Sequence, residues 1–388
     1  MTRPRVLFYV QHLLGVGHLY RACHVSRAMA AAGMDVHLVS GGMPVPGLEV
    51  PGVTFHQLTP LMCRDGDFRT LLTQDGSPAG DGFKRDRSRR LLSILDEVHP
   101  AALVIEAFPF GRRQMRFELT PFLERAHATR PAPIIVCSVR DILQAGARPE
   151  RDRETADTVN AFFDHVLVHG DPGFAALDRT FSLAGEIAGK LRYTGMVADP
   201  DKSAPAWSGN EHGEILVSAG GGAEGHDLLA AAVEARPMTS VRERHWRLLA
   251  GPNLAAAWQQ RLSSSMRDGI TVEPNRPDFP SLLAGCALSV SQAGYNTAVN
   301  LFECGCRSVL VPYAAHAQTE QTVRAQRMQE LGLARVVDPE NLSPSGLAEA
   351  IDAALAAPAP GPGDIDLDGA KTSARLLAQW LHCPPQGG

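Results

Sequence analysis

The sequence of 388 residues lacks the features that mark several specialised classes of protein. No apolar run approaches the roughly 18 residues of a membrane-spanning helix, and no signal-peptide core with a cleavage-type site follows the N-terminus. We therefore expect a cytoplasmic protein, for which peripheral membrane contact stays open. The formal net charge of -5 is not the basic excess of a general nucleic-acid binder, so we expect no nucleic-acid partner.

Cysteine spacing gives no sign of a disulfide framework or of a metal site. The seven cysteines are odd in number and scattered, and they include no CxxC pair. Such usage favours a reducing compartment. Cys304 and Cys306 flank one glycine, but no matching Cys or His pair lies near them, so we expect packing cysteines and no metal. No cofactor is expected either, and the sequence predicts no oligomeric state.

Short apolar runs alternate with helical stretches through most of the chain, which predicts βαβ units and a parallel sheet. The strand-like runs of the first half are Val6–Val10, Val36–Ser40, Ala102–Glu106, Ile134–Ser138 and Asp164–His169. Those of the second half are Ile215–Ala219, Trp246–Ala250, Ile270–Val272, Ala287–Ser291 and Ser308–Pro312. Between the two halves, Asp199–Gly213 has the polar, Pro- and Gly-containing composition of a linker.

The predicted fold class is therefore α/β, with two Rossmann-like domains that have parallel sheets. We place the first domain at residues 1–198, a linker at 199–212 and the second domain at 213–360. An amphipathic helix at 369–382 is expected to pack back on the first domain. Residues 60–90 do not fit the alternation and are expected to form either a functional loop or a solvated surface loop that leads into a helix. A further helix is expected at Leu254–Arg267.

The first glycine-rich turn, Gly15-Val16-Gly17-His18, stands where the first strand passes into the first helix. Small residues there let backbone N–H groups approach an anion or a sugar, so Gly15 and Gly17 are candidates for acceptor binding. His18 would project from the helix start toward the strand ends, where it can act as a general base. A helix-capping or packing role for His18 fits its position equally well.

The second glycine-rich turn, Gly220 to Gly225, also follows a strand and contains GxGxxG, the dinucleotide fingerprint. That fingerprint needs an acidic residue at the end of the next strand to hold a ribose. The next strand ends in Ala250-Gly251-Pro252-Asn253 and has no acid there. We therefore favour a phosphate or acceptor loop facing an interdomain cleft over NAD binding. The candidate donor-binding residues of this turn are Gly220, Gly221 and Gly222.

The segment Ser289–Thr297 predicts a strand, a tight turn and a helix start. Gly294 allows close approach of a ligand, and Asn296 and Thr297 are typical N-cap residues. Free N–H groups at such a helix start can hold a diphosphate. Glu303 lies about two turns further on, where a carboxylate can accept two hydrogen bonds from a ribose diol. The candidate donor-binding residues of this half are Gln292, Gly294, Tyr295, Asn296, Thr297, Glu303, Glu320 and Gln321.

Polar residues also follow two strands of the first half. Glu106 ends one strand and Asp141 follows the next, so both are alternative bases or acceptor-binding groups. Arg112 and Arg113 are candidates to bind an acidic or phosphorylated acceptor bidentately. A buried Arg–carboxylate pair and a solvated helix end are the competing interpretations. His169 ends a strand before an Asp-Pro helix start, and we favour a structural role for it.

Family resemblance is strongest in the C-terminal half. The donor-binding segment of family 28 and related GT-B glycosyltransferases resembles the run SQAGYNTAVNLFECGCRSVLVPYAAHAQTEQTVRAQRMQELG. This family includes the peptidoglycan N-acetylglucosaminyltransferase, and its Gly-rich loops are similar to GVGHLYRA and SAGGGAEG. A branch of predicted glycosyltransferases is similar in FYVQHLLGVGHLYRA and VHGDPGFAAL. The resemblance covers nearly the whole chain and implies the GT-B fold, in which two Rossmann-like domains face an interdomain cleft.

Residue by residue, the resemblance implies that Glu303 holds the nucleotide ribose and that Gly294 to Thr297 face the diphosphate. Glu320 and Gln321 would face the donor sugar, and His18 would lie near the acceptor as the base. The family's turn often carries an Asp before a Gln pair, whereas Gln318 and Glu320 occupy that neighbourhood here. The identity of the donor sugar therefore stays open.

The predicted function is transfer of a sugar from a nucleotide diphosphate sugar, most simply a UDP-sugar, to a hydroxyl of an unidentified acceptor. The resemblance implies inversion at the anomeric carbon. Helix-start N–H groups would stabilise the leaving diphosphate in place of a metal. A DxD spacing occurs at Asp65-Gly66-Asp67, but it lies away from any predicted strand end and is discounted. A sugar-nucleotide 2-epimerase and a non-catalytic nucleotide-sugar binding protein are the alternatives.

Overall fold

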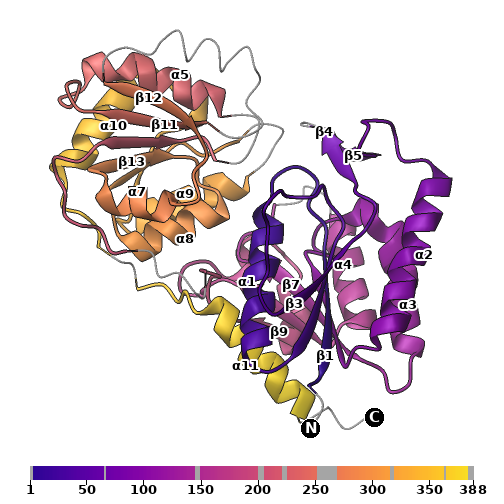
Figure 1. The fold of residues 1–388 in the computed structure, drawn as a ribbon. Coiled ribbons are helices and arrows are strands. Elements are labelled where there is room, and N and C mark those ends of the chain that lie inside the picture. Colours follow the sequence, from indigo (N-terminus) through magenta and orange to yellow (C-terminus); the bar gives the residue numbers. More distant parts are fainter. Residues whose placement is uncertain are drawn as a thin grey trace. The chain divides into compact units, whose positions relative to one another are not determined.

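The computed structural model describes residues 3–64, 67–144, 149–199, 205–220, 225–250, 269–314, 319–361 and 364–382. The chain divides into two compact units (Figure 1). The first unit comprises Met1–Asp201 together with Asp366–Gly388, and the second comprises Lys202–Ile365. The helix expected at Leu254–Arg267 lies outside the described residues.

A parallel sheet forms the centre of the first unit, and in the described residues its order is β3-β2-β1-β6-β7-β8-β9. Every neighbouring pair runs parallel. All residues of β1 after the first are buried, as in a strand that is covered on both faces. The strands are β1 (Arg5–Val10), β2 (Asp35–Ser40), β3 (Val53–Gln57), β6 (Ala102–Glu106), β7 (Ile134–Arg140), β8 (His165–His169) and β9 (Leu191–Tyr193).

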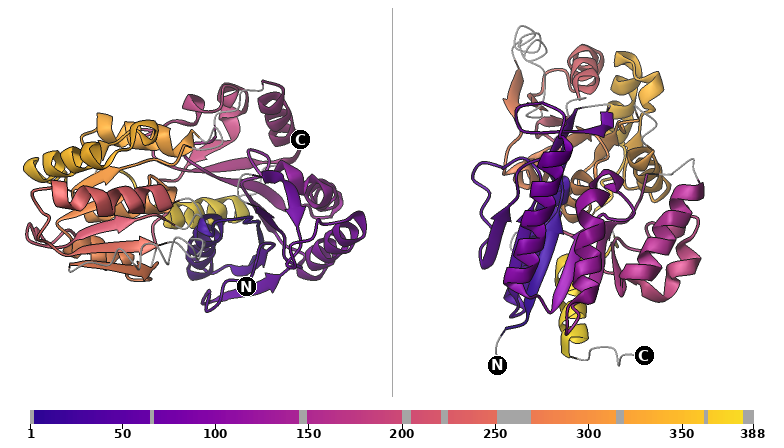
Figure 2. Two further views of the ribbon diagram at one scale, coloured as in Figure 1. Left: turned by 90° about the horizontal axis from the view of Figure 1, so that it is seen from above. Right: turned by 90° about the vertical axis from the view of Figure 1, so that its right-hand side faces the viewer.

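Helices cover both faces of this sheet, because alternate residues of a strand point to opposite sides. Leu7 and Tyr9 belong to the core formed with α2 (Asp81–Val98), α3 (Arg116–Ala128) and α4 (Pro149–Phe162). Val6 and Phe8 belong to the core formed with α1 (Gly17–Ala31) and α11 (Gly369–His382). Although α1 and α11 come from opposite ends of the chain, they pack side by side (Figure 1 and Figure 2). The short helices are η1 (Arg113–Met115), η2 (Leu177–Arg179) and η3 (Ala184–Lys190).

Residues 60–90 form a hairpin and then enter α2. The hairpin pairs β4 (Met62–Arg64) with β5 (Asp67–Leu72) in antiparallel fashion. Its base is fixed to the loop after β1, because the N–H of Cys63 donates to the carbonyl oxygen of Leu13 at 2.9 Å. The basic run Lys84 to Arg90 lies on α2. The segment is thus more regular than the loop we expected, since buried leucines of β5 and α2 attach it to the core.

Within this segment, Arg87 is buried and forms an ion pair that joins α2 to α3. Its Nε donates to Glu118 Oε2 at 2.7 Å, and its Nη2 donates to Gln11 Oε1 at 2.7 Å. The hydroxyl of Tyr9 donates to Glu118 Oε1 at 2.5 Å. A buried charge needs such partners, because its desolvation is costly. The cluster therefore attaches two helices to β1 and to the loop that follows it.

The second unit repeats the doubly wound plan with a parallel sheet of described order β12-β11-β10-β13-β14-β15. Helices α5 (His226–Ala235) and α10 (Pro344–Ala356) share a core with Val217 and Val309 on one face. Figure 1 shows α7 (Phe279–Gly285), α8 (Tyr295–Cys304) and α9 (Glu320–Glu330) on the other face. The remaining elements are β10 (Ile215–Ser218), β11 (Trp246–Ala250), β12 (Ile270–Pro274), β13 (Leu288–Ser291), β14 (Ser308–Leu310), β15 (Arg335–Val336), η4 (Arg236–Met238) and η6 (Pro339–Asn341).

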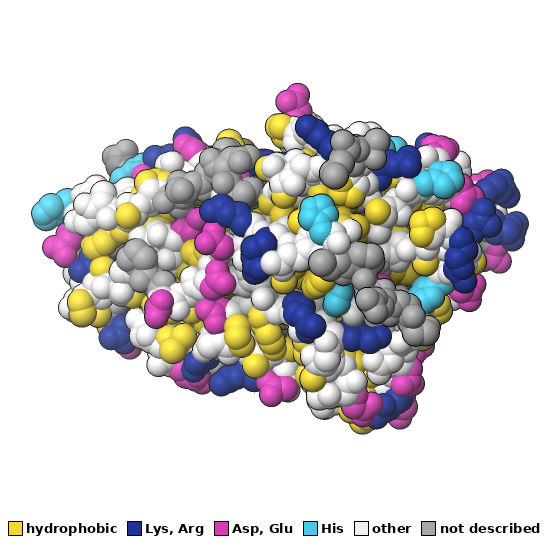
Figure 3. Space-filling view, turned by 90° about the horizontal axis from the view of Figure 1, so that it is seen from below, with side chains coloured by type: hydrophobic (Ala, Val, Ile, Leu, Met, Phe, Trp, Pro, Cys, Tyr) yellow, Lys and Arg dark blue, Asp and Glu magenta, His cyan; other side chains and the backbone are white. Residues whose placement is uncertain are grey.

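Both sheets have the strand order of Rossmann-type folds, which confirms the predicted α/β class with two parallel sheets. In such folds, ligands bind beyond the carboxyl ends of the strands, where the strand order reverses. That switch point lies between β1 and β6 in the first unit and between β10 and β13 in the second. Among the described residues, no helix combines the length and apolarity needed to cross a bilayer. Acidic and basic side chains both occur across the face drawn in Figure 3.

Candidate functional site

The switch point of the first unit brings together His18 and Glu106, which were separate candidates in the sequence. Glu106 is the last residue of β6, and His18 is the second residue of α1. His18 Nδ1 lies 2.9 Å from Glu106 Oε1. The side chain of His18 is 16% exposed, whereas that of Glu106 is 0% exposed. The imidazole therefore lies between a buried carboxylate and the surface.

Arg21, one turn after His18 on α1, completes this group. Its Nη2 donates to Glu106 Oε1 and lies 3.0 Å from His18 Nδ1. The sequence did not suggest Arg21, since an arginine inside a helix carries no local signal of a buried role. Only the fold shows that this face of α1 turns toward the end of β6. Arg21 is 3% exposed, so its charge compensates that of Glu106 in the interior.

The charges in this group favour an ionised Glu106 and a neutral His18. Burial opposes ionisation of Glu106, but the charge of Arg21 and the hydrogen bond from His18 hold the pKa of its carboxyl far below the ordinary value. Burial and the nearby charge of Arg112 hold the pKa of His18 well below 6.5, although Glu106 acts to raise it. Since a carboxylate only accepts hydrogen bonds, the contact with Glu106 assigns the proton of neutral His18 to Nδ1, and Arg21 Nη2 then donates to Glu106 and not to Nδ1. Its Nε2 is thus able to accept a proton.

Arg112 follows the same strand end and approaches the same loop. It adopts a left-handed backbone conformation with φ of 58°, which is costly for a non-glycine residue and is common at functional sites. Its Nε donates to the carbonyl oxygen of Gln11 at 2.8 Å. Among the described residues it makes no ion pair, and burial lowers the pKa of its guanidinium to about 10. An anionic ligand would therefore find an uncompensated, half-buried cation here.

Asp141 and Arg113 lie apart from the His18–Glu106 pair. Asp141 follows β7, is 0% exposed and makes no hydrogen bond to His18 within the described chain. The Nη2 of Arg113 donates to Thr155 Oγ1 and to the carbonyl oxygen of Arg151, both at 2.9 Å. Arg113 therefore contacts α4, whereas Arg112 contacts the loop after β1. The roles expected for Asp141 and Arg113 stay predictions.

The glycine turn before α1 is open at Gly15 and leads directly into the helix. A Cβ added at Gly15 would meet no heavy atom within 4 Å. Helix α1 begins at Gly17, and Val16 provides no side-chain cap for its first N–H groups. Such N–H groups attract an anion or a polar ligand group. Gly15, Gly17 and His18 are thus grouped at one strand–helix junction.

In the second unit, the corresponding junctions follow β10 and β13. Gly220 has φ of +70°, a conformation that favours glycine, and its carbonyl oxygen accepts from Asn275 Nδ2 at 3.1 Å. A Cβ at Gly220 would lie 3.4 Å from Gln292 Oε1, so the turns after the two strands lie side by side. Gly221 and Gly222 lie outside the described residues.

The expected N-cap at Asn296 and Thr297 is wrong. Gly294 is the N-cap of α8, with φ of -62° and ψ of 154°, and the helix begins at Tyr295. The earlier start allows Tyr295, 6% exposed, to pack beneath the turn. Because the helix begins at Tyr295, Asn296 and Thr297 lie in its first turn, and no side chain of the described residues caps the helix start. Glu303 lies in the last turn of the same helix and is partly exposed.

Two residues of α9 form hydrogen bonds with the backbone of the turn between β13 and α8. The amide oxygen of Gln321 accepts from the N–H of Ala293 and from that of Tyr313, both at 3.0 Å. The guanidinium of Arg324 donates to the carbonyl oxygen of Ala293 and to Glu320 Oε1, both at 3.0 Å. Arg324 is 0% exposed, and no sequence motif predicted a role for it. Gln321 and Glu320 therefore hold the turn through protein contacts, whatever they contact in a ligand.

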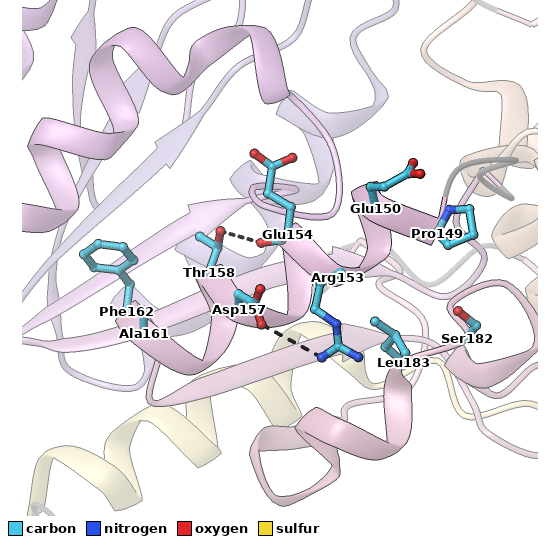
Figure 4. Close-up of a pocket in the computed structure, with 10 residues that line it drawn as sticks. All are labelled: Pro149, Glu150, Arg153, Glu154, Asp157, Thr158, Ala161, Phe162, Ser182 and Leu183. Carbon is cyan, nitrogen blue, oxygen red and sulfur yellow. Dashed lines mark hydrogen bonds and ion pairs between the residues drawn. The ribbon is translucent and has the colours of Figure 1, made fainter.

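A surface groove of the first unit lies away from the candidate site residues. A groove of about 700 Å³ runs along α4 and is lined by Arg153, Asp157 and Leu183 among other residues (Figure 4). In Figure 4 the guanidinium of Arg153 points toward Asp157. Arg153 also pairs with Glu186, so the charge of Arg153 is compensated within the protein. None of the predicted site residues lines this groove.

Comparison with known proteins finds a domain family whose model matches the C-terminal half of the chain. The profile of the glycosyltransferase family 28 C-terminal domain matches residues 215–360. A UDP-N-acetylglucosamine–N-acetylmuramyl-(pentapeptide) pyrophosphoryl-undecaprenol N-acetylglucosamine transferase of Exiguobacterium sp. is 35% identical over 136 residues. That alignment covers 35% of this chain and 37% of the relative. The chain therefore aligns with well under two thirds of this relative's length.

Solved structures extend the similarity to both units at the level of the fold. The crystal structure of Acinetobacter baumannii MurG matches with a TM-score of 0.61 and 15% identity, over 97% of this chain and 99% of that chain. The spinosyn rhamnosyltransferase SpnG complexed with thymidine diphosphate matches with a TM-score of 0.60 and 14% identity, over 98% and 96%. Similarity at this identity establishes the GT-B fold and leaves chemistry to be argued from the residues.

Proposed function

From the premise that this chain is a family 28-like protein with the GT-B fold, we propose that it is a glycosyltransferase. It would move a sugar from a nucleotide diphosphate sugar to an acceptor hydroxyl. The observation that carries the proposal is the paired His18 and Glu106 at a Rossmann-type switch point, in a chain whose residues 215–360 match a glycosyltransferase domain family. Such a pair suits removal of a hydroxyl proton.

In the proposed reaction, the acceptor hydroxyl donates its proton to His18 Nε2 as its oxygen attacks the anomeric carbon. Glu106 accepts from Nδ1–H, holds the ring in the required tautomer and stabilises the imidazolium that forms. The bond between the anomeric carbon and the diphosphate oxygen breaks, and the diphosphate leaves with the electron pair. Attack opposite the leaving group inverts the anomeric configuration. Burial favours the unprotonated imidazole before the reaction, as a base requires.

The donor is proposed to bind the second unit. The first turn of α8, which contains Asn296 and Thr297, would hold the diphosphate through backbone N–H groups and stabilise the leaving group without a metal. Gly220 and Gln292 flank that turn, and Glu303 would accept hydrogen bonds from the ribose diol. The side-chain N–H groups of Gln321 would face the sugar, since the amide oxygen is engaged by backbone N–H groups. UDP is the proposed nucleotide because the Exiguobacterium relative is named for a UDP-sugar.

The acceptor is proposed to carry an anionic group beside the hydroxyl that reacts. Arg112 is half-buried, has no ionic partner in the described chain and lies near His18, whose pKa its charge lowers. A phosphate or carboxylate could be bound by its free guanidinium nitrogens and by N–H groups near Gly15 and Gly17. Replacing Arg112 with Gln should then raise KM for the acceptor more than it lowers kcat.

A thermal-shift screen against nucleotide sugars, followed by product analysis, tests the proposal. Binding to the native state raises Tm by an amount set by affinity and concentration, so UDP and the correct UDP-sugar should both stabilise the protein. No shift with any nucleoside diphosphate would contradict the donor site. Formation of an epimer from UDP-N-acetylglucosamine without an acceptor would instead identify a 2-epimerase. Binding without turnover of any donor would identify a nucleotide-sugar binding protein.

A further inference from the structure

A line of buried polar side chains continues behind Glu106, away from His18. The hydroxyl of Ser138 contacts Glu106 Oε2 and lies 2.8 Å from His169 Nε2. On the far side of that ring, His169 Nδ1 lies 3.0 Å from Thr194 Oγ1. Ser138, His169 and Thr194 are each 0% exposed. Ser138 lies two residues before the end of β7, His169 ends β8 and Thr194 follows β9, so the line crosses the sheet near the edge where β1 and β6 present the candidate site.

The chemistry of Glu106 assigns a direction to this line of hydrogen bonds. An ionised carboxylate only accepts, so Ser138 must donate its single hydroxyl proton to Oε2. The oxygen of Ser138 is then free to accept from His169 Nε2–H. The unprotonated Nδ1 then faces Thr194 Oγ1 at 3.0 Å, and the hydroxyl of Thr194 is also within hydrogen-bond distance of the carbonyl oxygens of Gly195 at 2.9 Å and Val168 at 3.3 Å. Burial lowers the pKa of His169 to about 3, so the ring is neutral at physiological pH, as this arrangement requires.

Only one end of the line reaches the surface. His18 is 16% exposed, whereas Glu106, Ser138, His169 and Thr194 are wholly or almost wholly buried. The cluster around Arg87 shows that this fold also contains buried polar groups with no exposed member among its bonded side chains. The line behind Glu106 differs, because it ends on Oε2 of a carboxylate whose Oε1 binds the partly exposed imidazole of His18.

We propose that Ser138, His169 and Thr194 are positioning residues that hold Glu106 ionised and oriented, and so set the basicity of His18. The inference rests on the proposed role of His18 as a base for its functional meaning. The inference states that Ser138 and His18 are electrostatically coupled through the carboxylate of Glu106. The hydrogen bond from Ser138 spreads the charge of Glu106 and weakens its hold on an imidazolium. Loss of that bond therefore makes His18 easier to protonate.

Charged groups of the described residues act on His18 and Glu106, where this line ends. Glu106, Arg21 and Arg112 act on His18, with Glu106 raising and the two arginines lowering its pKa. Arg21, His18 and His169 act on Glu106. Because Arg21 and Arg112 are unchanged in variants of Ser138 or His169, a shift in the titration of His18 reports the line itself. This separates the coupling from a general change in the electrostatics of the first unit.

The test is a titration of His18 by NMR in the full chain with labelled histidine, without any substrate. His18→Gln assigns the resonance. Ser138→Ala should raise the pKa of His18 by about 0.5–1 unit, a shift typical of one lost hydrogen bond to a carboxylate. His169→Leu should shift it in the same direction, and His169→Gln, which can still donate to Ser138, should shift it less. Ser40→Ala is the matched control, since Ser40 is also a buried serine at a strand end but its hydroxyl lies outside this line.

A further variant and a pH–rate profile complete the test of this coupling. Thr194→Val preserves side-chain shape at the end of the line, so it provides the test if the Ser138 or His169 variants fold poorly. An unchanged His18 titration in the folded variants would overturn the proposal. If a sugar-transfer activity is found, the acid limb of its kcat/KM profile should move with the His18 titration. A shifted titration in a protein that turns over no nucleotide sugar would reject the proposed function and leave this coupling intact.

Discussion

His18 and Glu106 lie 88 positions apart in the sequence, and their proposed catalytic role depends on the hydrogen bond between them. Replacing His18 with Ala should lower kcat for sugar transfer by about 10²–10⁴-fold, the usual contribution of a general base. Affinity for UDP should stay within about twofold, because the proposed nucleotide contacts come from residues of the second unit. Steady-state kinetics and titration calorimetry measure the two quantities.

The control for this variant is His382→Ala, which removes an exposed histidine at the end of α11. It should leave both quantities unchanged. A His18→Ala protein with wild-type kcat and wild-type fold would show that another group, such as Asp141, removes the proton.

His169 predicts an acid-sensitive first unit. Its pKa is about 3 in the folded protein and near 6.5 in an unfolded chain, so only the unfolded state takes up this proton as pH falls below 6.5. The stability that this group contributes is present above pH 6.5 and is lost toward pH 3, at up to about 1.4 kcal/mol per pH unit. Hydrogen exchange of β7 and β8 peptides at pH 7 and pH 5 measures the loss.

In His169→Gln, this part of the pH dependence should disappear. The variant is expected to be less stable than wild type at pH 7, and the difference should narrow at pH 5. An equal difference at both pH values would mean that His169 is not held neutral in the folded state.

At the scale of helices and strands, sequence pattern predicted most of the elements that position the site. The runs at Val6–Val10 and Ala102–Glu106 correspond to β1 and β6, because strands buried on both faces are continuous apolar runs. The short edge strands β9 and β15 were missed, since two or three residues carry no periodicity. The start of α8 was placed too late, because a glycine in extended conformation replaced the side-chain cap that the composition suggested.

The ion pair between Arg87 and Glu118 predicts a large effect at the contact of α2 with α3. Glu118→Ala leaves the buried Arg87 guanidinium without its counter-charge and should destabilise the first unit by about 3–5 kcal/mol. Replacing both residues together, as Glu118→Leu with Arg87→Met, should cost less than Glu118→Ala. Urea unfolding followed by hydrogen exchange of α2 and α3 measures the free energies.

The same two helices supply the matched control. Arg125 and Asp96 also join α3 to α2, but their side chains are 57% and 49% exposed. Because exposed ion pairs contribute about 0–1 kcal/mol, Asp96→Ala should change stability only slightly. Similar losses for Asp96→Ala and Glu118→Ala would contradict the view that burial decides the strength of this contact.

For the whole molecule, the sequence could indicate two parallel α/β regions but not the pairings across them. The bonds of Arg21 and Ser138 to Glu106, and the bond between Ser138 and His169, join residues from α1, β6, β7 and β8. No local pattern encodes such contacts, because they arise only when the strands are ordered in the sheet. The hydrogen bonds of Gln321 and Arg324 to the backbone of Ala293 could not be predicted for the same reason. Polar residues at strand ends therefore indicated where the candidate site lies. The order of the strands in the sheet showed which of these residues contact one another.

The path of the chain gives a last prediction at this scale. The chain leaves the first unit near Asp201 and returns at Asp366, so that α11 covers α1 and the sheet face beneath it. Leu377 of α11 is 0% exposed in that core, and Leu377→Ala should destabilise the first unit by about 2–5 kcal/mol. Hydrogen exchange should accelerate in β1 and α1 while β10, β13 and α10 keep their wild-type protection. Equal acceleration in both units would mean that they unfold as one cooperative body, and that the division of this chain at Asp201 and Asp366 has no energetic counterpart.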